Sequence, residues 1–352
     1  MEQKKQLEDL LAVVIKEGAS DLHISVGKRP TIRVSGMLIA LEKENILKDE
    51  NTFGLMSALL DEEQKKEFLK NKEIDLSYSY NEMRFRCNCY FQKGTIAIAM
   101  RLIPKKIKTL QQLNLPQVLE SFASRRQGFF LVVGPVGHGK TTTLASMIEI
   151  INNTRAEHII TIEDPIEYLF EEKKSIIDQR EIKIDTADFH TALKSMFRQD
   201  VNVVMIGEMR GTETISTAVT AAETGHLVLS TLHTNNASQT IDRIIDSFPS
   251  ESQVQIRTQL TGSLIGIFSQ RLIPRIAGGI VPAYELLINN TAVSNLIREG
   301  RTHEIDSVIE TSSESGMVDM NRSLAELVRA GEITLDDARK YSTKIQGLEK
   351  LL

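Results

Sequence analysis

The first part of the chain switches between helical and strand-like spacing of its hydrophobic residues. At its start, apolar residues recur at helical spacing before Gly18, where a helix would stop; they are Leu7, Leu10, Leu11, Val14 and Ile15. There follow apolar stretches at 22–26, 31–34 and 37–41, a helical stretch over 52–70, and strand-like runs at 74–80, 83–91 and 95–102. This order predicts an α+β domain at residues 1–102.

From Gly128 onward, strand-like apolar runs alternate with helical stretches. The runs at 129–133, 158–162, 203–206 and 227–232 are typical of the parallel sheet of an α/β fold. After Gly278 and Gly279 we expect mostly helix, with amphipathic stretches near 292–299, 324–330 and 335–344. The predicted organisation is therefore the first domain at 1–102, a linker and lead-in at 103–127, an α/β domain at 128–290 and a helical end at 291–352.

Composition and charge exclude several classes of protein. Hydrophobic residues make up 41% of the chain and charged residues 25%, which is the mixture of a globular protein. The formal net charge of -5 gives no general positive field, so we expect no nucleic-acid partner. The charged start and the lack of an 18-residue apolar run predict no transmembrane segment.

The two cysteines, Cys87 and Cys89, are two positions apart. On a strand this spacing puts both side chains on one face, where they do not meet in the geometry of a disulfide. The sequence has no CxxC pair, which excludes a four-cysteine zinc module. We therefore expect a reducing, cytoplasmic compartment.

A phosphate-binding motif lies between a predicted strand and a predicted helix. Residues 134–141 fit G-x-x-x-x-G-K-[ST] directly after the run at 129–133. In such a loop the backbone N–H groups cradle phosphate oxygens, while Lys140 would reach the β- and γ-phosphates and Thr141 would offer its hydroxyl to Mg²⁺. The predicted nucleotide-binding residues are Gly134, Pro135, Val136, Gly137, His138, Gly139, Lys140, Thr141 and Thr142.

Two carboxylates and a histidine follow other strands of the same predicted sheet. Glu163 and Glu208 each come at the end of an apolar run, where α/β sheets bind ligands, and Glu208 has the Walker B arrangement. Such carboxylates can hold Mg²⁺ or orient an attacking water. Each alone could be a helix cap or a surface ion pair, but the pair after a P-loop favours catalysis. His233, just past a third run, could donate to a γ-phosphate.

Several segments, read in order, identify a family. They are GPVGHGKTTT, TIEDPIEY, RQDVNVVMIGEMRGTETISTAVTAAETGHLVLSTLHTNNA, and AVSNLIREGRTHEI followed by GMVDMNRSLAEL. Weaker matches such as SDLHI and RFRCN extend the resemblance toward the start of the chain. The chain resembles the type II/IV secretion system ATPases, and among them it is most similar to the type IV pilus retraction ATPases.

This resemblance implies a fold and a setting. It implies an α/β protein with a PAS-like α+β N-terminal domain, a RecA-like P-loop ATPase domain and a helical C-terminal end. The family's members are homohexameric motors that hydrolyse ATP with Mg²⁺. They act with an inner-membrane platform protein of the pilus machine, so the resemblance also implies peripheral association with the inner face of the cytoplasmic membrane.

The resemblance also assigns residues to roles. Lys140, Glu163, Glu208 and His233 match catalytic positions, with Glu163 as the catalytic carboxylate, Glu208 in the Walker B box and His233 in the His box. Thr141, Glu163 and Glu208 would hold Mg²⁺ directly or through water. The N-terminal domain of the family brings arginines to the nucleotide, and Arg84, Arg86 and Arg101 occupy the matching stretch.

The assignment to the retraction subfamily depends on the segment near residue 292 and on two features that the sequence lacks. The segment AVSNLIRE resembles the AIRNLIRE of retraction ATPases, and neither a zinc insert nor a large N-terminal extension is present. The chain departs from the family at Asn202, Gly211, Ser294 and His138, where the family has a small serine. The alternatives are a pilus-extension or type II secretion ATPase, and a non-hydrolysing nucleotide-binding paralogue that regulates a motor ring.

Overall fold

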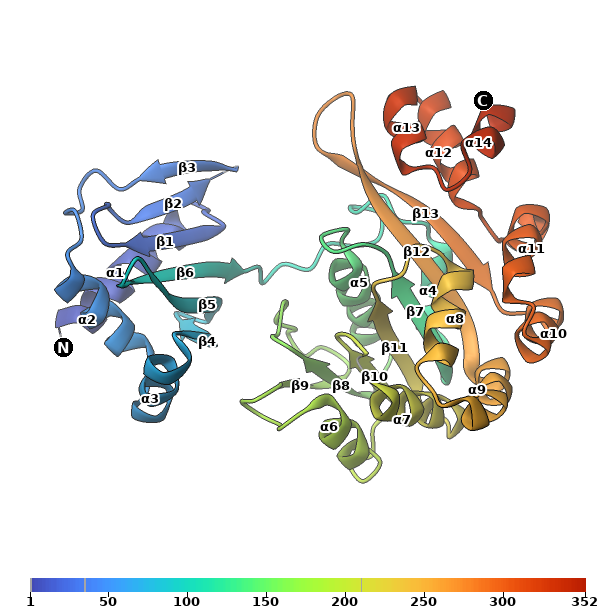
Figure 1. Ribbon diagram of the computed structural model, residues 1–352, viewed down its shortest axis with the longest axis horizontal. Helices are drawn as coiled ribbons and strands as arrows, with labels where there is room; N and C mark the ends of the chain where they lie inside the picture. Colours follow the sequence, from blue (N-terminus) through green and yellow to red (C-terminus); the bar gives the residue numbers. More distant parts are fainter. Residues whose placement is uncertain (1, 35, 210) are drawn as a thin grey trace. The chain divides into compact units, whose positions relative to one another are not determined.

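The structure is a computed structural model that describes residues 2–34, 36–209 and 211–352. The chain divides into two compact units (Figure 1). One consists of Met1–Lys106 with Glu167–Leu169, and the other of Ile107–Ile166 with Phe170–Leu352. Each unit has a hydrophobic core of its own.

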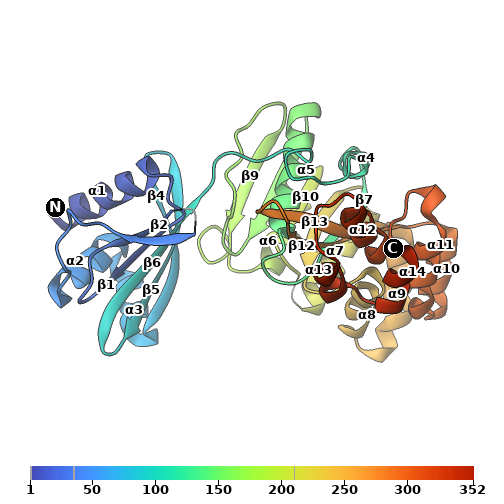
Figure 2. The same ribbon diagram turned by 90° about the horizontal axis from the view of Figure 1, so that it is seen from above.

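The first unit is an antiparallel sheet with helices packed on one face (Figure 2). Its elements are α1 (Glu2–Lys16), β1 (Asp21–Ser25), β2 (Thr31–Val34), β3 (Met37–Ala40), α2 (Asp49–Leu59), α3 (Glu62–Asn71), β4 (Glu73–Tyr80), β5 (Met83–Gln92) and β6 (Thr95–Ile103). The strand order is β3-β2-β1-β6-β5-β4, with every neighbouring pair antiparallel. These elements confirm the predicted order of helices and strands.

One predicted helix, at 52–70, is in fact two. The Asp61 side chain accepts hydrogen bonds from the backbone N–H groups of Glu63 (2.9 Å) and Gln64 (2.8 Å), which caps α3. A residue that caps a helix has extended backbone, so the preceding helix cannot run through it. The chain therefore ends α2 at Leu59 and begins α3 at Glu62.

Strand β5 shows the alternation that separates core from surface in this unit. Phe85, Cys87 and Cys89 are each fully buried, whereas Arg84 and Arg86 lie on the opposite face. Both thiols are free, and they share one face as the C-x-C spacing predicts.

The second unit is built on a seven-stranded sheet with helices on both faces. Its first elements are α4 (Val118–Ala123), β7 (Gly128–Val133), α5 (Lys140–Thr154), β8 (His158–Glu163), β9 (Ile176–Glu181), α6 (Phe189–Met196), β10 (Val203–Ile206), α7 (Thr212–Glu223) and β11 (Leu227–Leu232). The remaining elements are α8 (Ala237–Asp246), α9 (Ser250–Ser263), β12 (Leu264–Pro274), β13 (Ile280–Ile288), α10 (Thr291–Glu299), α11 (Ile305–Thr311), α12 (Met320–Arg329), α13 (Leu335–Tyr341) and α14 (Ile345–Leu351), with short 3₁₀ turns η1 (Thr302–Glu304) and η2 (Ser313–Ser315).

Strand β7 is an interior strand of this sheet, between β12 and β11, and is buried on both faces. Phe129, Leu131 and Val133 pack into one core with residues of α6 to α9, while Phe130 and Val132 pack into a second core with α4 and α5. Because both faces are covered, the strand reads as an unbroken apolar run. The α/β class expected from the sequence is confirmed.

The sheet has three strands that were not predicted, β9 at one edge and β12 and β13 at the other. The order is β13-β12-β7-β11-β10-β8-β9, and β13 runs antiparallel to β12 whereas the other neighbouring pairs are parallel. The expectation of mostly helix after Gly279 is wrong for Ile280–Ile288. Proline is tolerated in a strand at the edge of a sheet, and Pro282 lies in this edge strand, opposite Leu272.

Helices α12, α13 and α14 pack against the β12–β13 hairpin near its turn. Ile273 and Val281 of the hairpin share a core with Leu324 of α12, Ala338 of α13 and Leu348 of α14. Among the helices of the described residues, none is both long enough and apolar enough to cross a membrane.

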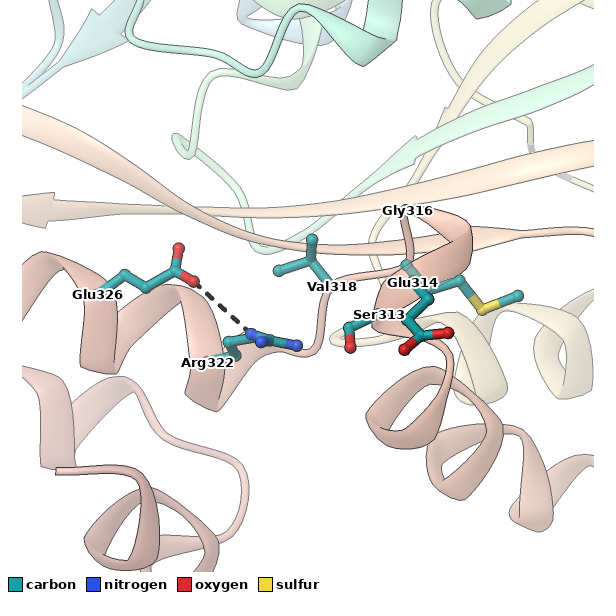
Figure 3. A pocket seen from close by; sticks show the side chains of 7 residues that line it. Ser313, Glu314, Gly316, Val318, Arg322 and Glu326 are labelled. Carbon is teal, nitrogen blue, oxygen red and sulfur yellow. Dashed lines mark ion pairs between the residues drawn. The ribbon is translucent and has the colours of Figure 1, made fainter.

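A cavity of about 290 Å³ lies beside η2 and α12 (Figure 3). It is lined by Ser313, Glu314, Gly316, Met317, Val318, Arg322 and Glu326. The guanidinium Nε of Arg322 lies 3.6 Å from Oε1 of Glu326, so the two charges at this wall are paired.

Candidate active site

The sheet brings four predicted segments to one edge. Strands β7, β11, β10 and β8 are parallel neighbours, so their carboxyl ends meet on the same side (Figure 1). The P-loop follows β7, His233 follows β11, Glu208 follows β10, and Glu163 ends β8. Segments far apart in the sequence therefore lie side by side at the place where α/β sheets bind ligands.

The P-loop owes its shape to glycines. Gly134, Gly137 and Gly139 have φ angles of 144°, 80° and 79°, a region that side chains disfavour. Gly139 caps α5, which begins at Lys140, so the positive end of the helix dipole lies at the loop. Val136 is exposed at the loop's outer bend, and Thr141 and Thr142 are half-buried in the first turn of α5.

Lys140 is buried and contacts both the loop and a histidine. Its Nζ donates to the carbonyl oxygens of Gly134 and Pro135, at 2.9 Å each, and lies 3.1 Å from Nδ1 of His233. An ammonium group only donates, so Nδ1 accepts and the neutral imidazole carries its proton on Nε2.

The same histidine faces the carboxylate of Glu208. Nε2 of His233 lies 3.6 Å from Oε2 of Glu208, slightly longer than a hydrogen bond. His233 thus stands between the lysine of the P-loop and Glu208. The structure brings these three predicted residues into one chain of contacts.

Glu163 is nearly inaccessible, with 2% of its surface exposed. Thr161 on the same strand donates its hydroxyl to Oε1 of Glu163 at 2.6 Å, and Gln179 of β9 donates to the same oxygen at 3.4 Å. The backbone N–H of Gly207 donates to the carbonyl of Ile162 at 2.8 Å. This bond holds the end of β10, and with it Glu208, next to the end of β8.

His138 lies within the P-loop, two positions before Lys140. Its side chain is half-buried. Burial lowers the pKa of His138 below its usual value, and the nearby cations Arg271 and Lys140 lower it further. At neutral pH the ring is therefore uncharged.

Sequence reasoning missed three polar residues at this site, Thr161, Gln179 and Gln270. Gln270 is 3% exposed on β12, and its amide contacts the P-loop. No local signal marks a single glutamine inside a strand, and its partner in the loop is more than a hundred positions away. The contact becomes visible only when the pairing of β12 with β7 is known.

The predicted arginines share one face of the first unit's sheet. Arg84 and Arg86 alternate with core residues on β5, and Arg86 lies opposite Arg101 of β6. Nε of Arg101 donates to Oδ1 of Asp21 at 2.8 Å, and Arg33 lies 3.7 Å from the other carboxylate oxygen. Asp21 therefore orients Arg101, and both Arg101 and Arg86 are exposed.

The chain is similar to known proteins along most of its length. A family model described as type II/IV secretion system protein matches residues 3–339. The type IV pilus retraction ATPase PilT of Pseudomonas aeruginosa is 42% identical over 335 residues, which cover 95% of this chain and 97% of that one. A twitching motility protein of Neisseria gonorrhoeae is 42% identical over 321 residues, covering 91% of this chain and 86% of that one.

A solved structure has the same fold. The crystal structure of the pilus retraction motor PilT with bound ADP matches with a TM-score of 0.91 at 43% identity, over 97% of this chain and 98% of that one. The similarity extends through both units.

Proposed function

The chain belongs to the type II/IV secretion system protein family, and on this premise we propose that it is an ATP-hydrolysing motor that powers retraction of type IV pili. The observation that carries this proposal is the line of contacts from Lys140 through His233 to Glu208, beside the buried carboxylate of Glu163. The relatives named for pilus retraction and twitching motility support the direction of movement.

Each residue of the site has a task in this proposal. Lys140 and the backbone N–H groups of 134–141 bind the β- and γ-phosphates of ATP at the positive end of α5. Glu163, oriented by Thr161, positions the attacking water and draws its proton. His233 contacts both Lys140 and Glu208 and so fixes their positions relative to each other. Hydrolysis to ADP and phosphate then needs little movement of these groups.

The oxygen donors at the site fit a magnesium ion. Mg²⁺ prefers a few hard oxygen ligands together with substrate phosphates, and the Thr141 hydroxyl with the carboxylates of Glu208 and Glu163 are of this kind. When bound, Mg²⁺ neutralises charge on the phosphates. Thr141 lies in the first turn of α5 and Glu208 two strands away, at the same sheet edge.

We extend the proposal to the assembly and its surroundings. The first unit is a PAS-like domain and the second a RecA-like ATPase domain with a helical end, and six copies form the working ring. The ring acts in the cytoplasm on a platform protein at the inner face of the membrane. An arginine among Arg84, Arg86 and Arg101 reaches the γ-phosphate, where a guanidinium offsets developing charge.

Phosphate release by the full-length protein, with and without magnesium, tests the assignment of the site. Lys140→Ala, Glu208→Ala and Glu163→Gln should each lower turnover at least about 100-fold, because each removes a group that acts on the transferred phosphoryl or the water. Glu314→Gln, which changes an exposed carboxylate outside the site, is the matched control. Wild-type turnover in the three site variants would contradict the assignment.

Deletion of the gene tests the direction of force. A retraction motor removes pilin, so cells without it should be hyperpiliated and should not twitch. Bald cells would instead indicate an extension motor. Nucleotide binding without turnover by the wild-type protein would favour a regulatory member of a motor ring.

A further inference from the structure

Strand β12 contacts the P-loop through two separate hydrogen bonds to one residue. Nε2 of Gln270 donates to the carbonyl oxygen of His138 at 2.9 Å, and the backbone N–H of Leu272 donates to Nδ1 of the His138 ring at 2.8 Å. One bond fixes the backbone of His138 and the other fixes its side chain.

Gln270 also holds the helix that follows the loop. Its Oε1 accepts a hydrogen bond from the hydroxyl of Thr143 at 2.7 Å, in the first turn of α5. Both ends of one buried amide are therefore used, one on the loop and one on the helix.

The same strand lies against both ends of the loop. A Cβ atom at Gly134 would meet the backbone oxygen of Gln270 at 2.3 Å, and one at Gly139 would meet the Gln270 amide nitrogen at 2.9 Å. A Cβ at Gly137, in the middle of the loop, would have nothing within 4 Å. The loop thus packs closely against β12 at its ends and is hydrogen-bonded to β12 at His138, while a side chain at Gly137 would meet open space.

We propose that His138 and Gln270 are positioning residues that hold the P-loop in its phosphate-binding shape before the nucleotide arrives. The proposal rests on the proposed function of the site. A loop that is already ordered loses little conformational entropy on binding. The hydrogen bonds from β12 should therefore strengthen nucleotide binding rather than speed the chemical step.

The surroundings of His138 keep it able to accept this bond. Burial, together with the cations Arg271 of β12 and Lys140 of α5, lowers the pKa of the imidazole and keeps the ring neutral. The N–H of Leu272 donates to Nδ1, so the ring proton is on Nε2. The ring of Tyr341 in α13 lies edge-on, with a centroid distance of 6.3 Å. Arg271 donates to the backbone carbonyl of Tyr341 at 2.7 Å, which anchors this stretch of β12 to α13.

Titration with a fluorescent ADP analogue, alongside steady-state ATP hydrolysis, tests the proposal on the full-length protein. His138→Ala should raise the Kd for ADP and the KM for ATP about five- to tenfold while kcat stays within about twofold. His138→Asn should restore binding, because the Asn Oδ1 can take the place of Nδ1 as acceptor for Leu272. Gln270→Ala should weaken binding in the same way.

The control is His226→Ala, at the opposite end of β11 from the site, which should leave the Kd unchanged. The thermal midpoint without nucleotide separates binding effects from unfolding. Two results would overturn the positioning role and leave the proposed function standing. One is a His138→Ala protein that binds ADP like the wild type, and the other is a His138→Asn protein as impaired as His138→Ala. A wild-type protein that bound no nucleotide would overturn the proposed function as well.

Discussion

Glu285 is a carboxyl group buried away from the active site. It lies on β13 with 6% of its surface exposed, and its Oε1 accepts a hydrogen bond from the backbone N–H of Ala237 at 2.8 Å. Burial, with smaller contributions from Asp306 and Asp319, raises the pKa of Glu285 to about 7. The folded protein therefore holds this group protonated at pH values where the unfolded chain ionises it.

This shift makes stability depend on pH at one residue. The contribution of protonated Glu285 to the free energy of unfolding is fully present below pH 4.5, the ordinary pKa, and is lost as the pH rises to about 7. Glu285→Gln removes the ionisation and keeps an acceptor for Ala237. It should raise the free energy of unfolding by about 3 kcal/mol at pH 8, at about 1.4 kcal/mol per pKa unit, and by about 1 kcal/mol or less at pH 5. Urea denaturation at the two pH values measures the difference; an equal effect at both would contradict the shift.

At the scale of elements, the turn from β7 into α5 depends on where its glycines lie. Gly134→Ala places a methyl group against the backbone oxygen of Gln270, which cannot move aside without shifting β12. We expect loss of nucleotide binding and destabilisation of more than about 2 kcal/mol. A methyl group at Gly137 would meet open space, so Gly137→Ala should lower the free energy of unfolding by only about 1 kcal/mol, the cost of a side chain at positive φ. ADP titration and thermal unfolding compare the two; equal effects would show that β12 does not constrain the loop.

How well each strand could be predicted depends on whether its own residues form a recognisable hydrophobic pattern. Strands β7, β10 and β11 are covered on both faces, so burial alone makes them apolar and they were predicted close to their bounds. Strand β9 reads IIDQRE at the edge of the sheet and gives little pattern. Strands β12 and β13 form through their pairing with each other and with β7, which no local window contains.

The same distinction holds for the site. The P-loop, Glu163, Glu208 and His233 could be found because each follows a recognisable strand. Gln270 and Thr161 could not, since their roles depend on partners that folding brings to them. The split of the helix at Asp61 was readable in principle, because Asp61 and Gln64 have the spacing of a capping box.

At the scale of the whole molecule, the proposed ring raises the question whether the arginines act on the nucleotide of their own copy or on that of a neighbouring copy. Mixing two inactive proteins distinguishes these two arrangements. Lys140→Ala subunits keep the arginines, and subunits with Arg84→Ala, Arg86→Ala and Arg101→Ala keep the lysine. If an arginine acts on the neighbouring subunit, the mixture should recover part of the wild-type turnover, because some interfaces combine an intact loop with an intact arginine.

The measurement is phosphate release as a function of mixing ratio, with assembly followed by light scattering. A mixture of Lys140→Ala with Glu208→Ala is the matched control and should stay inactive, since both changes damage the same unit. No recovery in a mixture that assembles as the wild type does would place the arginine and the phosphates in one subunit.

The two buried cysteines of β5 have a practical consequence. Burial raises the pKa of Cys89 to about 12 and that of Cys87 well above its usual value. Maleimides react with the thiolate, so both native thiols should be inert in the folded protein. A single cysteine introduced on the surface of each unit would then be the site of dye attachment. Energy transfer between the two dyes could follow the motor through its cycle with the native cysteines left in place.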